Sequence, residues 1–186
     1  MAVLSNKFDI LRGWPNSSAV AEDFIIPSKS EIDNLLNSHK FLQGQWVALK
    51  STTDGTMACE PLIADVDSGA ARACYLIIEG RDDYSAQFAN RVTCLVGGGY
   101  MVRLPHKGVD SDGQSYDILG SAVSNFIPGR PVKVEDGKLS PVNPDDVDGA
   151  GGAEAANIAE LALQIQIVGR VMAVNSADNT IDVFIN

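Results

Sequence analysis

The sequence is poor in the residue types that build most enzyme sites. It holds only two histidines, His39 and His106, and neither has a partner at metal-ligand spacing. The three cysteines are Cys59, Cys74 and Cys94, and their spacing matches neither a zinc ligand pair nor a CxxC redox motif. No GxSxG or HExxH motif occurs. We therefore expect no catalytic residue, no cofactor site and no metal site, and we expect the cysteines to be buried, reduced thiols.

Basic clusters and long apolar runs are also missing. The formal net charge is −10, and the lysines and arginines stand singly among acidic residues. Because such a surface repels phosphate, we expect no nucleic-acid partner. No stretch approaches the roughly 20 apolar residues that cross a bilayer, and the first residues lack the basic and apolar regions of a signal peptide. The sequence predicts a protein without a membrane partner, made in a reducing cytoplasm.

Apolar residues are well represented, at 45% of the chain, which is enough for one sizeable core or two small ones. Short segments alternate apolar and polar residues, and turn signals such as Asp54-Gly55 and Asp136-Gly137 separate them. The chain closes on "QIQIVGRVMAVNSADNTIDVFIN", which predicts a hairpin around Asn175 to Thr180. We predict a mainly β fold, a β-barrel or β-sandwich over residues 44–186, with the last strand paired inside a sheet.

The first 43 residues follow another pattern. Residues 1–27 mix apolar side chains with Gly, Pro, Ser and Asn without a period, which predicts an extended N-terminal arm. Such an arm must pack on its own domain, a neighbouring copy or another protein, and we favour the latter two. Residues 28–43 predict one short N-terminal helix, since Ser28 and Glu31 have capping-box spacing. The candidate residues of the arm for contact with a further copy or another protein are Phe8, Ile10, Leu11, Trp14, Phe24, Ile25 and Ile26.

Two tryptophans and three loop stretches carry further signals. Trp46 alternates with Ala48 in a predicted strand and is assigned to the core, whereas Trp14 is the better contact candidate. "GGGYMVRL" lacks the Lys-Ser/Thr of a phosphate loop and predicts a bulge, a tight bend or a close backbone approach. The acidic stretches Asp110–Asp117 and Asn143–Gly149 do not complete a calcium loop and predict solvated turns. The Gly, Ala and Asp content near 143–155 predicts a flexible loop.

Four segments follow one another from Gly44: "GQWVALKSTTDGTMACEP", "CYLIIEGRDDYSAQFANRVTCLVGGGYMVRL", "NFIPGRPVKVEDGKLSPV" and "IQIVGRVMAVNSADNTIDVFIN". This succession resembles the head decoration (cement) proteins and related small virion proteins of tailed bacteriophages. The shared elements are an early G-x-x-V strand, a G-x-P-V-x-V-x-D-G-K-L hairpin, and a V-G-R-V hairpin after a Gly/Ala-rich loop. The resemblance excludes the arm and the helix, and "VKVEDGKLSP" carries most of it.

The resemblance implies a structural protein and not an enzyme. It implies a location on the outer capsid surface of a virion, with the major capsid protein and further copies of the chain, as a homotrimer, for partners. Apolar arm contacts and sheet-edge contacts would then bridge capsid subunits. A tail, neck or baseplate protein is an alternative within the same class. From another class, a carbohydrate-binding outer module or a hydrolase whose carboxylates meet only in the folded chain stays open.

Overall fold

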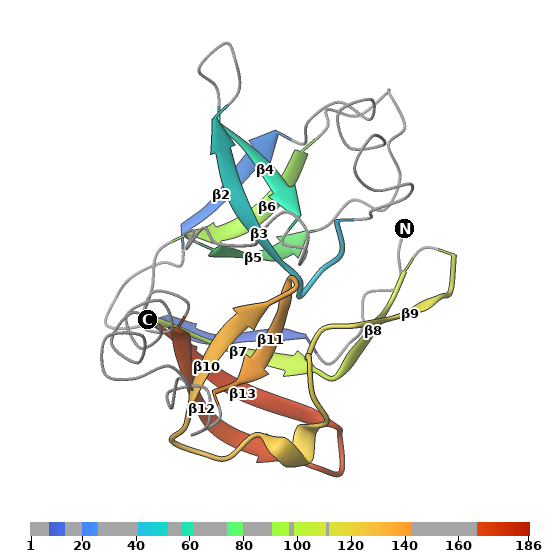
Figure 1. Cartoon of the computed structure of the whole chain (residues 1–186), viewed down its shortest axis with the longest axis vertical. Helices are drawn as coiled ribbons and strands as arrows, with labels where there is room; N and C mark the ends of the chain where they lie inside the picture. Colours follow the sequence, from blue (N-terminus) through green and yellow to red (C-terminus); the bar gives the residue numbers. More distant parts are fainter. Residues whose placement is uncertain are drawn as a thin grey trace, which may run out of the picture.

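The computed structural model describes residues 8–13, 20–25, 41–51, 57–61, 74–79, 91–96, 99–110, 112–142 and 167–186. These residues form strands β1 to β13 and one 3-10 helix, η1 (Val123–Asn125), shown in Figure 1. The strands build a six-stranded sheet, a ring of five strands, and a separate two-stranded hairpin. The prediction of a mainly β fold is confirmed.

The six-stranded sheet is antiparallel throughout and has the order β1-β7-β13-β12-β10-β11. Its strands are β1 (Asp9–Gly13), β7 (Tyr100–Pro105), β10 (Pro131–Glu135), β11 (Lys138–Pro141), β12 (Ile167–Asn175) and β13 (Thr180–Ile185). Alternate residues face the core, as the period of two requires. Val102, Val183 and Val171 lie side by side on three neighbouring strands, and all three are fully buried.

The last strand of the chain lies inside this sheet, as predicted. β13 pairs with β12 on one side and with β7 on the other, so its backbone hydrogen bonds are used on both edges. Ile181 stands opposite Leu104 of β7 and opposite Val174 of β12. A chain end held in this way presents no open edge to another molecule.

The β10–β11 hairpin confirms the predicted turn at Asp136-Gly137. Both residues have positive φ, 50° and 71°, as a two-residue type I′ turn requires. The same turn links the sheet to the ring, because the Trp46 backbone N–H donates a hydrogen bond of 2.9 Å to the Gly137 carbonyl. The glycine at this position therefore serves both the turn and the contact between the two parts of the molecule.

Five further strands pair in the order β2-β4-β3-β5-β6. They are β2 (Val20–Ile25), β3 (Trp46–Ser51), β4 (Met57–Pro61), β5 (Cys74–Glu79) and β6 (Arg91–Val96). β2 also pairs with β6 over six residues, so the order returns to its start. The contact between β2 and β4 is one parallel pair, Ile25 with Ala58. β3 and β4 form the predicted hairpin, and the turn residues between them lie outside the described part of the chain.

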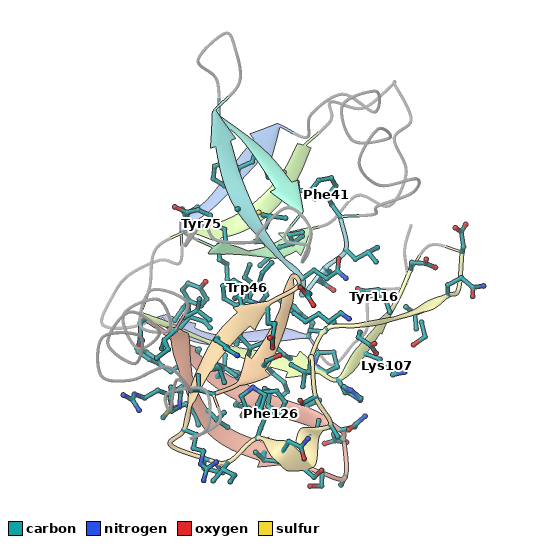
Figure 2. The ribbon with its side chains drawn as sticks, in the orientation of Figure 1. Phe41, Trp46, Tyr75, Lys107, Tyr116 and Phe126 are labelled. Atoms are coloured by element: carbon teal, nitrogen blue, oxygen red, sulfur yellow. The ribbon has the colours of Figure 1, made fainter. Side chains whose placement is uncertain are left out.

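Sheet and ring share one hydrophobic core. Trp46 and Leu76 of the ring pack in the same cluster as Tyr100 and Leu104 of the sheet. Trp46 is 2% exposed, which confirms its assignment to the core, and Figure 2 shows it between the two parts. A second, smaller cluster fills the ring and consists of Phe24, Phe41, Val47, Cys59, Ile77, Val92 and Cys94.

The N-terminal region differs from its prediction. Residues 9–13 and 20–25, assigned to a free extended arm over 1–27, form β1 on the edge of the sheet and β2 in the ring. The chain therefore packs on its own fold here, which is the alternative that we did not favour. Most of the segment predicted as a helix, 28–43, and the loop near 143–155 lie outside the described residues. Residues 41–43 are described and are not helical.

The arm prediction failed for a physical reason. β1 contains a bulge between Ile10 and Arg12 that shifts the alternation, and neither β1 nor β2 is next to its partner strand in the sequence. Their partners lie far along the chain: Asp9 pairs with Arg103, and Val20 pairs with Val96. A local sequence pattern does not contain such long-range pairing.

Candidate protein-contact surfaces

The predicted contact residues that the structure describes belong to two different parts of the fold. Phe8 is half-buried against the shared core, and Ile10 pairs with Val102 in the sheet. Leu11 is half-buried and lies at the bulge of β1. The fold therefore uses this part of the predicted arm to extend the six-stranded sheet.

The remaining predicted contact residues belong to the ring or lie outside the described part. Phe24 is 8% exposed and packs inside the ring, where its aromatic ring lies 5.9 Å from that of Tyr75. Its side chain is thus turned away from any partner, which corrects its assignment as an external contact. Ile25 pairs with Arg91 and Ala58 within the ring. Trp14 and Ile26 lie outside the described residues, and their contacts stay predictions.

One row on the outer face of the six-stranded sheet consists mainly of residue types that are common in protein interfaces. Cross-strand pairs place Met101, Phe184, Arg170 and Pro131 in one row over β7, β13, β12 and β10. All four are half-buried or exposed, in contrast to the buried valine row on the other face. Methionine, phenylalanine and arginine are enriched in interfaces relative to other surfaces. Met172, two residues after Arg170 in β12, is 52% exposed.

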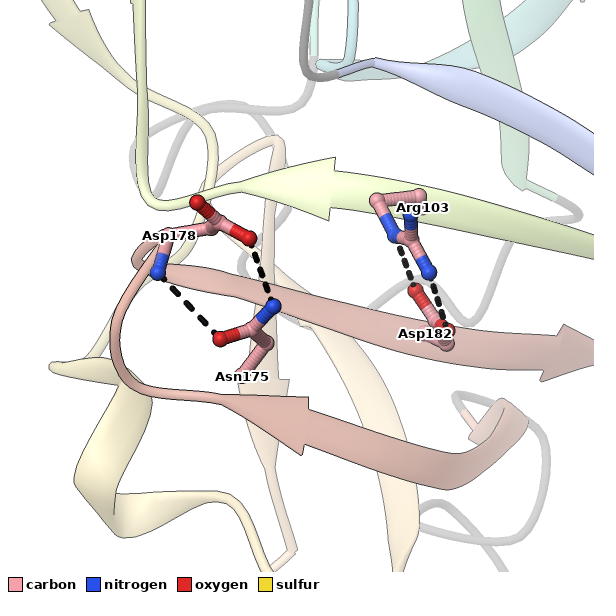
Figure 3. A network of polar contacts seen from close by, with 4 residues as sticks. All are labelled: Arg103, Asn175, Asp178 and Asp182. Carbon is pink, nitrogen blue, oxygen red and sulfur yellow. Dashed lines mark hydrogen bonds and ion pairs between the residues drawn. The ribbon is translucent and has the colours of Figure 1, made fainter.

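Polar contacts fix the geometry of β7, β12 and β13 (Figure 3). The Arg103 Nε donates to Asp182 Oδ1 at 2.7 Å, and its Nη2 donates to Oδ2 at 2.8 Å, which gives a bidentate pair across β7 and β13. At the β12–β13 turn, the Asn175 Nδ2 donates to Asp178 Oδ2 at 2.6 Å, and the Asp178 N–H donates to Asn175 Oδ1 at 3.2 Å. The Arg103–Asp182 pair joins the neighbouring strands β7 and β13, and the Asn175–Asp178 contacts stabilise the β12–β13 turn.

A turn packs beside β12 and enlarges the exposed surface there. Pro128 and Gly129 form a turn in which the Arg130 N–H donates to the Ile127 carbonyl at 3.0 Å, and Gly129 has a φ of 88°. The Gly129 N–H donates to the Val171 carbonyl at 2.8 Å. We call Ile127, Arg130, Arg170 and Met172 the β12 surface.

The β12 surface joins exposed apolar area with positive charge. The Arg170 Nη1 donates to the Gly129 carbonyl at 3.2 Å, so this guanidinium is held beside the turn. Arg130 and Arg170 are both exposed, and Ile127 is 44% exposed. The sequence contained a signal for the turn in "IPGR", which is typical of proline and glycine at the centre of a tight turn. The position of this turn beside Met172 depends on tertiary pairing and had no signal.

A hairpin projects on the right of the molecule in Figure 1, away from β12 at the lower left, and forms the second exposed surface. It consists of β8 (Lys107–Val109) and β9 (Ser115–Asp117). Val109, in β8, is 46% exposed. We call Val109, Asp110, Asp112 and Asp117 the hairpin surface.

Tyr116 anchors this hairpin to the rest of the fold. Its ring lies directly over Gly108, its cross-strand partner, and leaves no room for a side chain at that position. Its hydroxyl donates to the Gln43 carbonyl at 2.9 Å, and the Gln43 side chain in turn donates to the Ile78 carbonyl at 2.9 Å. The hairpin is therefore held by a chain of contacts that leads into the ring (Figure 2).

One carboxylate of the acidic loop at the end of this hairpin has a structural role. Asp110 Oδ1 accepts hydrogen bonds from the Asp112 N–H at 3.0 Å and from the Gln114 N–H at 2.7 Å. This arrangement agrees with the acidic turn predicted for Asp110–Asp117. In the described ranges, no group of three or more His, Cys, Asp or Glu residues could hold a metal ion. None of the helices within those ranges is long and apolar enough to cross a membrane.

The buried thiols are in an environment that suppresses their reactivity. Cys59 and Cys94 are free and buried, which confirms the prediction for these two cysteines. Burial raises the pKa of the Cys59 thiol to about 12. Burial, and secondly the nearby Cys94, raise the pKa of the Tyr100 hydroxyl well above its usual range. Because the thiolate is the reactive form, the Cys59 thiol is unreactive near neutral pH.

Comparison with known proteins adds no relative: no family model, curated protein or solved structure matches this chain.

Proposed function

We propose that the chain is a virion structural protein that decorates a tailed-phage capsid and stabilises it by binding across major capsid subunits. The observation that carries the proposal is the outer face of the six-stranded sheet. There Met101, Phe184 and Arg170 form a row of interface-type residues on a rigid antiparallel sheet. The resemblance of the hairpin succession to phage decoration proteins supports the same function.

The physical basis of this function is adhesion by a rigid body. This sheet face binds without a large ordering cost, because its side chains stand on strands that are paired on both sides. The net charge of −10 favours solubility at the high concentration near a capsid. Many weak contacts on one lattice add through avidity, so a single copy needs only moderate affinity.

A finer description of the fold accompanies the proposal. We propose that the ring β2-β4-β3-β5-β6 acts as a small β-barrel whose interior is filled by the cluster around Phe24 and Val47. The cyclic strand order supports this, although one residue pair, Ile25 with Ala58, makes the contact between β2 and β4. A filled interior of this kind provides rigidity and not a ligand cavity.

Binding to capsids tests the proposal. The purified chain is mixed with capsids of the phage that encodes it, and bound protein and the temperature of capsid rupture are measured. We expect saturable binding and a higher rupture temperature. Exclusive binding to tails would assign the chain to the tail, neck or baseplate. Absence of binding to any virion part, together with binding to a glycan or a hydrolytic activity, would overturn the proposal.

Trp14 offers a sharper variant within this experiment, because it stays a predicted capsid contact. We expect Trp14→Ala to lower capsid occupancy while the melting temperature of the free protein stays unchanged. Phe24→Ala is the matched aromatic change inside the fold, and it should lower the melting temperature, since Phe24 is buried. Unchanged capsid occupancy for Trp14→Ala would remove this residue from the proposed contact.

A further inference from the structure

We propose that copies of this chain bind each other head to tail, with the hairpin surface of one copy on the β12 surface of the next. This inference goes beyond the proposed function, which concerns binding to the capsid, and it names two surfaces through which copies of the chain bind each other. The capsid is not needed for the contact. It can therefore be tested in solution, separately from capsid binding.

The first observation is the distribution of exposed apolar side chains. Among the described residues, the large hydrophobic side chains that are exposed are Val109, Ile127 and Met172. Val109 belongs to the hairpin surface, whereas Ile127 and Met172 belong to the β12 surface. Exposed apolar area on a soluble protein marks contact sites when it is gathered and surrounded by polar residues. The β12 surface fits this description, and Val109 gives the hairpin surface one exposed apolar side chain beside its aspartates.

The second observation is that the two surfaces carry opposite charge. Arg130 and Arg170 flank the apolar residues of the β12 surface. The hairpin surface carries three aspartates, of which Asp117 forms an ion pair with Lys107 of the same hairpin at 3.5 Å. The whole chain has a net charge of −10, so most of its surface repels a second copy. The basic β12 surface and the acidic hairpin surface are therefore complementary in charge.

The third observation concerns position and rigidity. In Figure 1 the β8–β9 hairpin and β12 lie on opposite sides of the molecule, so one copy cannot join its own two surfaces. A contact between unlike surfaces is heterologous, and it closes into a ring when the rotation between copies allows it. The Tyr116 hydroxyl bond to Gln43 and the Arg170 bond to Gly129 hold both surfaces in place before contact. Little conformational entropy is then lost on binding.

Two single variants, each with one surface disabled, test the proposal by sedimentation velocity over a wide concentration range. Met172→Glu adds an acid to the β12 surface, and Val109→Glu adds one to the hairpin surface. Ala177→Glu adds the same charge to an exposed turn outside both surfaces and serves as the control. We expect the wild type and the control to assemble. Each single variant should need at least about tenfold higher concentration to do so.

Mixing the two variants gives the sharpest result. The Met172→Glu copy keeps an intact hairpin surface, and the Val109→Glu copy keeps an intact β12 surface. Their mixture should form one-to-one dimers and no larger ring, because only one productive contact remains. Higher salt should weaken the wild-type assembly, since part of the contact is charge attraction.

Several results would overturn the inference. A wild type that stays monomeric up to its solubility limit would do so, as would variants that assemble like the wild type. Loss of capsid binding by both variants with unchanged self-assembly would assign the two surfaces to the capsid. Intact head-to-tail assembly without any capsid binding would keep this inference and reject the proposed function. Unchanged melting temperatures will show that the variants fold, because both changed side chains are exposed.

Discussion

The two strands that flank β7 come from opposite ends of the chain, and they differ in how strongly they are held. β13 pairs with β7 over six residues and with β12 on its other edge. β1 pairs with β7 over four residues, contains a bulge, and forms the edge of the sheet. The same neighbour thus receives an interior strand from one end and an edge strand from the other. The C-terminal strand β13 is therefore an interior strand of the sheet, whereas the N-terminal strand β1 lies at its edge.

Truncation at each end gives the largest expected effect. We expect removal of residues 180–186 to abolish cooperative unfolding, because it deletes an interior strand with fully buried Ile181 and Val183. Removal of residues 1–13 should leave a cooperative transition at lower denaturant, since the described residues that are lost are the edge strand β1 and the half-buried Phe8. Urea unfolding followed by circular dichroism measures both. Equal loss of cooperativity in the two truncated proteins would contradict the difference between β13 and β1.

Unfolding at alkaline pH tests how tightly the ring is closed. The second N-terminal strand, β2, is part of this ring. The Cys59 pKa is raised from 9.0 to about 12 in the folded state, so the unfolded chain loses this proton first as pH rises. The stabilising contribution is fully present below pH 9 and is lost as the pH approaches 12. This thiol should lower the free energy of unfolding by up to about 1.4 kcal/mol per pH unit in that window.

Cys59→Ala provides the control for this titration. The variant keeps the alkaline contribution of Tyr100, whose pKa is also raised, but lacks that of the thiol. Its free energy of unfolding should therefore fall less steeply than that of the wild type between pH 9 and 12. Parallel pH profiles for the two proteins would show that Cys59 is accessible to water, and the ring would then be less tightly closed than described here.

A smaller effect is expected at the β10–β11 turn, which joins two strands that are neighbours in the sequence. Gly137→Val should destabilise the protein by on the order of 1 kcal/mol or more, because φ is 71° there and a β-branched side chain is strained. Asp136→Asn is the matched change, and it should be nearly neutral, since asparagine tolerates a positive φ. Thermal or chemical unfolding measures both. A neutral Gly137→Val variant would mean that the turn is not of this type.

Sequence reasoning succeeded where the determinants of structure are local. The Asp136-Gly137 turn and the β12–β13 hairpin join neighbours in the chain, so their alternation and turn residues indicated both hairpins. The pairing of the last strand inside a sheet followed from a physical argument about exposed apolar edges, whereas its second partner, β7, had no signal. The burial of Trp46 followed from alternation within its strand.

The same reasoning failed where pairing is distant. β1 and β2 were interpreted as an arm, because nothing near Ile10 or Phe24 indicates partners some 70 to 90 residues away. Phe24 thereby changed from a candidate contact to a core residue. The β12 surface was missed for the same reason, since the turn after Ile127 lies beside β12 through hydrogen bonds of Gly129 and Arg130 with Val171. Local pattern predicts hairpins, and tertiary pairing decides which side chains remain exposed.

The location of the chain in the virion tests the central claim most directly. A reconstruction of the virion of the encoding phage, at a resolution that distinguishes strands, will show whether the six-stranded sheet and the ring are present and where. We predict density for both on the outer capsid surface, spanning major capsid subunits, with neighbouring copies in contact. Density confined to the tail, or purified virions that lack the chain altogether, would contradict the account.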